Sequence, residues 1–226
     1  GMGWFVMGLL LIFNIGHDAV HGTLSPNDRI NRAASLVFNM VGGNAYSWRM
    51  KHNLAHHLHT NIEGMGFDTE MDPLMRGSPE SPHRPQYRFQ VLTAALVYPL
   101  LSLLILLVAD FSILPKVRAA GLIERHPPGE WVVLVASKAG YLFLALGGPV
   151  AAGWSWVDAL GVFLAGHLLC GLLIAAVFQP SHYFPESQFA ADDHNRPNWF
   201  ALQTKTTMDI APNSRWLTAV LGGLNH

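Results

Sequence analysis

The chain has 226 residues, of which 50% are hydrophobic and 13% charged, with 14 Lys and Arg against 15 Asp and Glu and a net charge of -1. This composition excludes a disordered chain and argues against an ordinary soluble domain, in which about 25% of the residues are charged. The balanced charge offers no basic face for nucleic acid, so the expected partner is membrane lipid. The single cysteine, Cys170, excludes an intrachain disulfide framework and a cysteine-based metal cluster, whereas the 12 histidines are unusually many.

Apolar runs divide the chain. A hydrocarbon core about 30 Å thick needs roughly 20 helical residues, and residues 89–109, 131–152 and 156–178 meet that length. Residues 4–15 form a shorter run, which we interpret as the end of a membrane span; a signal peptide is disfavoured because no Lys or Arg precedes the run. The pattern predicts an all-α, multi-pass integral membrane protein with one domain over residues 1–226.

Basic residues predict the orientation, because Lys and Arg favour cytoplasmic loops. They gather before residue 89, between 109 and 131, and after 178, whereas the turn at 153–155 has none and Lys138 alone lies within a run. The histidine-rich segments are therefore expected on the cytoplasmic side, in a bacterial inner membrane. Both flanks of residues 89–109 then face the cytoplasm, so we expect this run to form a shallow or re-entrant helical pair broken at Pro99.

Six histidines lie at the cytoplasmic ends or in the loops of the predicted membrane segments. GHDAVHG contains His17 and His21, whose spacing of four places both on one helix face. In KHNLAHH, His52 and His56 are expected to share a face, with His57 turned roughly 100° away toward a second metal. One such pair would be weak evidence, but two clusters and a later histidine, His182 in QPSHYF, are expected to converge at one level of the membrane.

His167 differs from these because it lies among apolar residues inside the last run. A helix would place it about 22 Å from His182, too far to bind the same metal. We expect its imidazole to be hydrogen-bonded to a neighbouring helix rather than to a metal. For His59, a supporting role beside the metal and simple exposure both stay open.

The ligand type narrows the choice of metal. Imidazole suits iron, zinc, copper and nickel, and six histidines exceed the three or four that one zinc ion needs. The HExxH motif of zinc peptidases is absent from the sequence, and the pair of Glu-x-x-His motifs that soluble di-iron bundles carry on two helices is absent too, since the spacing occurs once, at Glu80 and His83 in a proline-rich stretch. These observations favour a histidine-rich di-iron centre at a membrane surface.

The motifs GHDAVHG, WRMKHNLAHHLHTNIEG, FQPSH and QTKTTMDIAPNSRWLTAVLGGLNH resemble the membrane fatty acid desaturases, closest to the linoleoyl-CoA or front-end branch. The resemblance implies a helical membrane desaturase fold with a cytoplasmic di-iron site. It implies that dioxygen serves to introduce a cis double bond into an acyl chain carried by coenzyme A or by a lipid. It also implies an external electron donor, a b5-type cytochrome or a ferredoxin with its reductase. The iron ligands that it implies are His17, His21, His52, His56, His57 and His182.

The sequence also contains candidates for residues that support the metal ligands. Asp18 and Asp209 are candidates for carboxylates that orient the ligating imidazoles, although each also suits a solvated acid, and Gln179 is a candidate for a water-mediated contact. Trp48, Arg49 and Lys51 suit either an anionic partner or anionic lipid.

The resemblance departs from the family at both ends. The chain opens inside an apolar run, and it stops at His226, before the expected Gln-x-x-His-His motif. We therefore expect a domain incomplete at both ends that binds iron poorly on its own, with His226 as a weak candidate ligand.

Two alternative functions remain open from sequence. The same histidines suit a related membrane di-iron hydroxylase or ketolase. A non-catalytic metal- or haem-binding membrane protein is the alternative from another class; haem held between two histidines would need them on facing helices within the membrane.

Overall fold

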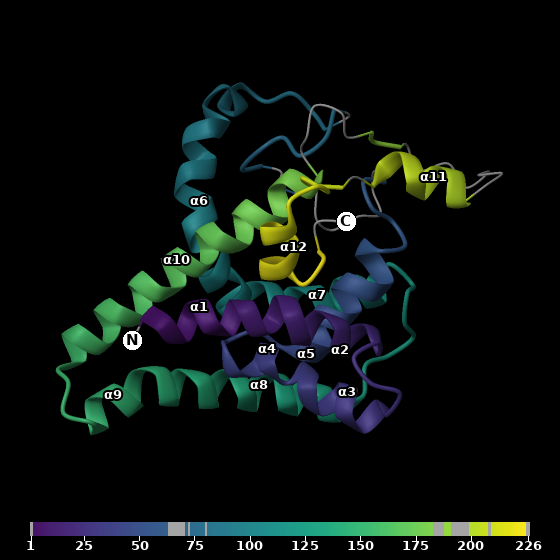
Figure 1. The fold of residues 1–226 in the computed structure, drawn as a ribbon. Helices are drawn as coiled ribbons and strands as arrows, with labels where there is room; N and C mark the ends of the chain where they lie inside the picture. The colour runs from purple at the N-terminus through teal and green to yellow at the C-terminus, as the bar shows by residue number, and fades with distance from the viewer. Residues whose placement is uncertain are drawn as a thin grey trace.

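The computed structural model describes residues 2–62, 71, 73–79, 81–182, 188–190, 199–207 and 209–224. Within these residues the structure is helical, with one isolated β-bridge between Ile62 and Ala190 and no strand (Figure 1). The helices, with π- and 3₁₀-helical segments marked η, are α1 (Met2–Leu11), η1 (Ile12–Gly16), α2 (His17–His21), α3 (Asp28–Ser35), α4 (Val37–Met40), α5 (Ala45–Arg49), η2 (Met50–His56), η3 (Pro85–Phe89), α6 (Gln90–Leu104), η4 (Ile105–Ala109), α7 (Asp110–Ala119), α8 (Pro128–Leu142), η5 (Phe143–Gly147), α9 (Gly148–Ala151), α10 (Trp156–His182), α11 (Trp199–Thr206) and α12 (Arg215–Leu221).

Four helical stretches are long and apolar enough to cross a membrane. They are Met2–His21, Pro85–Ala119, Pro128–Ala151 and Trp156–Pro180. The predicted class, an all-α protein with several membrane helices, is therefore confirmed. The first stretch is longer than the run at residues 4–15 suggested, because the helix continues through η1 into α2.

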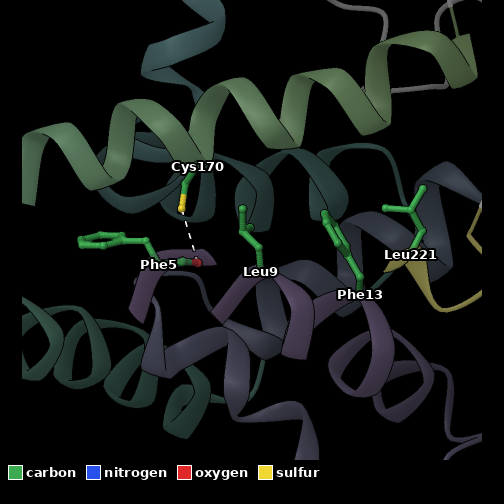
Figure 2. Packing of buried hydrophobic residues seen from close by; sticks show 5 residues of the cluster. All are labelled: Phe5, Leu9, Phe13, Cys170 and Leu221. Carbon is green, nitrogen blue, oxygen red and sulfur yellow. Dashed lines mark hydrogen bonds between the residues drawn. The ribbon is translucent and has the colours of Figure 1, made fainter. Parts of the chain in front are cut away.

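The long helix α10 organises the packing. One face of α1 and η1 lies against it, and Figure 2 shows this contact as a row of buried side chains formed by Phe5, Leu9, Phe13, Cys170 and Leu221. The Phe13 ring meets the Phe178 ring edge to face at 6.3 Å, whereas Phe5 meets His167 farther back along α10. The order of these two contacts shows that α1 and α10 run in the same direction.

The stretch Pro85–Ala119 is continuously helical but changes direction at η4. Along α6, Tyr98 donates to Gln179 Oε1 at 3.0 Å and Ser102 lies 2.8 Å from His167 Nδ1, so α6 is antiparallel to α10. Beyond η4 the helix axis bends, and α7 runs antiparallel to α8, because Lys138 of α8 binds the Ile105 carbonyl oxygen whereas His126, which precedes α8, binds that of Leu114. Figure 1 shows α6 and α7 leaving η4 in different directions.

This path corrects one expectation from sequence. The chain does not break at Pro99, since α6 is continuous from Gln90 to Leu104 and the change of direction comes at η4. By length and composition the whole stretch also qualifies as a span. That it enters and leaves on the same side of the membrane stays a prediction.

Two buried polar clusters hold these helices together at mid-depth. His167 is 1% exposed and bonds Ser102 of α6 and, at 2.9 Å, the Tyr141 hydroxyl of α8, which confirms the expectation of an intramembrane histidine with partners on neighbouring helices. Lys138 pairs with Asp110 and also donates to the carbonyl oxygens of Gly42 and Ile105. Each charged group at this depth therefore has a partner, as the low dielectric requires.

The contact between α6 and α10 depends on Gly171. A Cβ atom at this position would clash with the backbone carbonyl oxygens of Pro99 and Tyr98, which cannot move aside as a flexible side chain can. We expect Gly171→Ala to lower the free energy of unfolding by about 2 kcal/mol, a typical cost of overpacking. Thermal unfolding in detergent measures this loss.

Gly161→Ala in the same helix is the matched control, because no atom lies within 4 Å of its Cβ position. It should leave stability unchanged or raise it by up to about 1 kcal/mol through helix propensity. Equal effects of the two substitutions would contradict the close approach of α6 and α10.

Candidate metal centre

Two short helical segments supply the described histidines of the site. Helix α2 carries His17 and His21 and ends at Gly22, whose φ of 76° lies in the left-handed region that glycine tolerates. The Asn53 side chain donates to the Val20 carbonyl oxygen at 2.9 Å and so ties η2 to the end of α2. The two histidine segments are thereby held side by side although they are far apart in sequence.

The second segment is a π-helix, which the sequence pattern did not predict. Helix α5 begins where the Asn44 side chain accepts a hydrogen bond from the Ser47 N–H, and η2 continues it over Met50–His56. Within η2 the His57 N–H donates to the His52 carbonyl oxygen, five residues back, at 3.0 Å. This wider turn brings His57 beside His52, and π-helical turns are frequent at functional sites.

Four imidazoles converge at this point. The Nε2 atom of His52 lies 2.9 Å from that of His17 and 3.1 Å from that of His57, which in turn lies 3.1 Å from Nε2 of His21. One ring nitrogen from each of the four lies within 4.8 Å of the others. Such a set of nitrogen donors fits a transition metal, and imidazole suits iron among others.

His52 is the most enclosed member of the cluster. Burial lowers the pKa of His52 well below its ordinary value, and the neighbouring imidazoles, His56 first among them, lower it further. Its ring stacks on Trp48 at 5.1 Å, and Trp48 stacks in turn on Phe38. The ring is thus neutral, the form that binds metals, and fixed in orientation.

His56 lies beside the four nitrogens rather than among them. Its ring is parallel to that of His52, with 5.2 Å between centroids, and it also contacts the ring of His57. The expectation that His52 and His56 lie on one side of the helix agrees with this stacking. The expectation that His57 is turned away is wrong for the described structure, because the π-helix replaces the α-helical spacing on which it was based.

The remaining predicted residues are placed as follows. The Asp18 carboxylate lies 3.4 Å from Nδ1 of His17, which suits an acid that orients a ligating ring. Gln179 accepts a hydrogen bond from Tyr98, and Asp209 is exposed. His182 is the last residue of α10, but its side chain and the whole of His226 lie outside the described residues, so that both stay predictions.

The contacts predicted for Trp48 from the sequence are wrong. It was grouped with Arg49 and Lys51 as a contact for an anionic partner or for lipid, yet its ring is packed between Phe38 and His52. Both Trp48 Nε1 and Asn44 Nδ2 are buried without a hydrogen-bond acceptor among the described residues. The sequence did contain a signal for the contact between Trp48 and His52. Trp48 lies four residues before His52, and residues at this spacing share a helix face.

Two cavities lie in the apolar part of the protein, and the smaller one reaches Trp48, which packs on His52. The smaller, of about 60 Å³, is lined by Trp48, Asn44 and the row of Phe5, Leu9 and Phe13. The larger, of about 770 Å³, lies among α1, α8, α9 and α10 and includes Tyr141 and Phe163. Phe5 lines both cavities and separates them.

The helical membrane architecture and the cluster of imidazoles define a class of membrane protein with a histidine metal site. The sequence model of the fatty acid desaturase family matches residues 1–226, and the chain belongs to that family. The predicted family is thereby confirmed. No solved structure matches the chain.

Named relatives agree with this assignment. The chain is 30% identical to the sn-1 linoleoyl-lipid 6-desaturase of Synechocystis sp., over 100% of this chain and 65% of the relative. It is 31% identical to the protein of the same name from Arthrospira platensis, over 95% of this chain and 59% of the relative. The acyl-lipid (8-3)-desaturase of Physcomitrium patens is 27% identical, over 94% of this chain and 46% of the relative. The chain thus spans less than two thirds of the length of these relatives.

Proposed function

We propose that this protein is an oxygen-dependent desaturase that introduces a cis double bond into an acyl chain carried by a membrane lipid. The observation that carries the proposal is the cluster of four imidazoles, separated from a cavity only by the Trp48 ring that packs on His52, in a chain of the fatty acid desaturase family. The lipid-linked substrate is proposed because the named relatives are acyl-lipid desaturases. The overall reaction consumes dioxygen, two electrons and two protons and releases two molecules of water.

The proposed cofactor is a pair of iron ions. Described histidines His17, His21, His52 and His57 would hold metal through the nitrogens that converge, and the family resemblance adds His56 and His182 as ligands. Bound iron would supply the dioxygen chemistry that amino acid side chains lack. The proposed donor of electrons is a b5-type cytochrome or a ferredoxin with its reductase, docking on the cytoplasmic side where we place the cluster.

The protein's own residues orient the ligands and exclude water. Trp48 packs on one face of His52 and thereby fixes the ring, while Asp18 contacts the outer nitrogen of His17. The apolar row of Phe5, Leu9 and Phe13 lines a dry path for methylene groups. Confinement of the acyl chain in this path would restrict the oxidation to one methylene pair.

The test of the function is expression of the complete reading frame that contains this chain in a host without polyunsaturated lipids. Gas chromatography with mass spectrometry of the host's acyl chains should detect a new double bond at one position. Hydroxylated or keto products would instead assign the protein to the related hydroxylases or ketolases. An unchanged acyl profile together with an intense Soret band in the purified protein would replace the proposal by a haem protein.

Phe5 provides a test of the path proposed for the acyl chain. Phe5→Ala should join the two cavities, so the ratio of turnover on chains two carbons longer to that on the preferred chain should rise by roughly tenfold, as expected for added hydrophobic contact. Competition between the two chain lengths, followed by product analysis, measures this ratio.

Leu9→Ala is the control, because Leu9 lines only the smaller cavity. It removes packing from the same helix face but leaves Phe5 in place, so it should not favour longer chains. An unchanged preference in Phe5→Ala would show that the larger cavity does not receive the substrate.

A further inference from the structure

Two side chains that line the smaller cavity each carry a buried hydrogen-bond donor without a partner. The donors are Asn44 Nδ2 and Trp48 Nε1, and neither has an acceptor within the described parts of the chain. Buried polar groups in folded proteins are almost always hydrogen-bonded, and a donor left without an acceptor destabilises the fold. Two such donors at one cavity therefore point to a ligand that supplies the acceptor.

Both donors are fixed in orientation. The Asn44 Oδ1 atom accepts the Ser47 N–H at 2.9 Å and so caps α5, which identifies the other end of the amide as the donor. Trp48 follows one turn later, where its backbone N–H donates to the Asn44 carbonyl oxygen at 2.9 Å. The Trp48 ring is held by stacking between Phe38 and His52. The two donors thus lie one turn apart on the helix that leads into the imidazole cluster.

The other polar groups of the cavity restrict the kind of ligand. The Asp110 carboxylate on the lining pairs with Lys138, and the Ser102 hydroxyl on the lining is hydrogen-bonded to His167. A water molecule would accept from the two nitrogens, but it would also bring two hydrogens that need acceptors. A carbonyl oxygen accepts two hydrogen bonds and donates none, so it matches the unpartnered groups more closely.

We infer that Asn44 and Trp48 bind the ester carbonyl oxygen of the acyl lipid. This inference rests on the proposed function, because that function places an acyl chain in the cavity. The methylene groups of an acyl chain are alike, whereas its carbonyl is a polar group that a protein can hold at one place. Since Trp48 stacks on His52, a carbonyl held there fixes which methylene pair comes to the metal centre.

The test compares two lipids that differ only at this carbonyl, an acyl ester and the corresponding alkyl ether. Native mass spectrometry of the complete protein in detergent measures the binding of each. The ester should bind about twenty-five-fold more tightly than the ether, since one neutral hydrogen bond typically changes an affinity by about fivefold. Trp48→Phe keeps an aromatic ring beside His52 but removes the donor, so it should lower this preference to about fivefold and leave ether binding unchanged. The infrared band of an isotope-labelled ester carbonyl should move to higher frequency in the variant.

Tyr46→Phe is the matched control in the same helix. It also removes one donor from an aromatic side chain, but the Tyr46 hydroxyl bonds His126 Nδ1 and Tyr46 does not line the cavity. This variant should keep the full preference for the ester. Asn44→Ser supplies a second measurement, because serine can still cap α5 but lacks the amide donor, and it should lower the preference as Trp48→Phe does.

The outcomes separate the site from the reaction. Equal binding of ester and ether to the unsubstituted protein would overturn the inference and leave a water molecule as the acceptor for the two nitrogens. A preference that neither Trp48→Phe nor Asn44→Ser reduces would overturn it as well. Because these measurements need no turnover, a preference that depends on Trp48 would support the carbonyl site even if the expressed protein formed no double bond, a result that would reject only the desaturase function.

Discussion

His52→Ala should abolish metal binding and product formation. His52 is buried at the centre of the four imidazoles, with Nε2 atoms of two others within 3.1 Å. Its removal takes away a ligand and leaves a space under Trp48, so we expect the product to fall by at least about a hundredfold, the upper range for disturbing a metal site. Iron content per chain and acyl product analysis of the complete protein measure the two effects separately.

His59→Gln is the control in the same segment. His59 Nδ1 bonds the Ala55 carbonyl oxygen at 3.1 Å and is not one of the four converging residues. This variant should keep its iron and most of its activity. If His52→Ala retained full iron and full activity, the metal centre assigned to this cluster would be wrong.

Asp110→Asn should give the largest loss of stability. It leaves the Lys138 ammonium buried in the membrane region with two carbonyl oxygens but no carboxylate. Removing one partner of a buried ion pair typically costs about 3–5 kcal/mol, because the remaining charge is uncompensated. Denaturant or thermal unfolding in detergent should detect this change even where the metal site is intact.

Two further variants test whether the uncompensated Lys138 charge causes this loss of stability. Asp110→Leu/Lys138→Met removes both charges and should recover much of the stability, since an apolar pair of similar volume often replaces a buried ion pair at little cost. Asp158→Asn changes an exposed acid that bonds Ser155, so its effect should stay within about 0.5 kcal/mol. A double variant no more stable than Asp110→Asn would show that shape, and not charge, decides the packing at η4.

The sequence by itself determined the class of the protein and pointed to the four described histidines that converge. Apolar runs and helical spacing are local properties, so they predicted the membrane helices, the pair His17 and His21, and the buried, hydrogen-bonded role of His167. The residues that surround the histidines in the sequence motifs predicted the family.

Only the tertiary structure decided which groups meet. His17 and His52 are 35 residues apart, and their contact depends on how α2 and η2 pack; the place of His57 depends on a π-helical turn that α-helical spacing does not foresee. Likewise, Lys138 looked like an isolated charge inside an apolar run until the packing of η4 and α7 against α8 placed Asp110 beside it. The physical reason is that the spacing of apolar and polar residues determines which residues share a helix face. Which residues of other helices that face contacts is determined only when distant segments pack together.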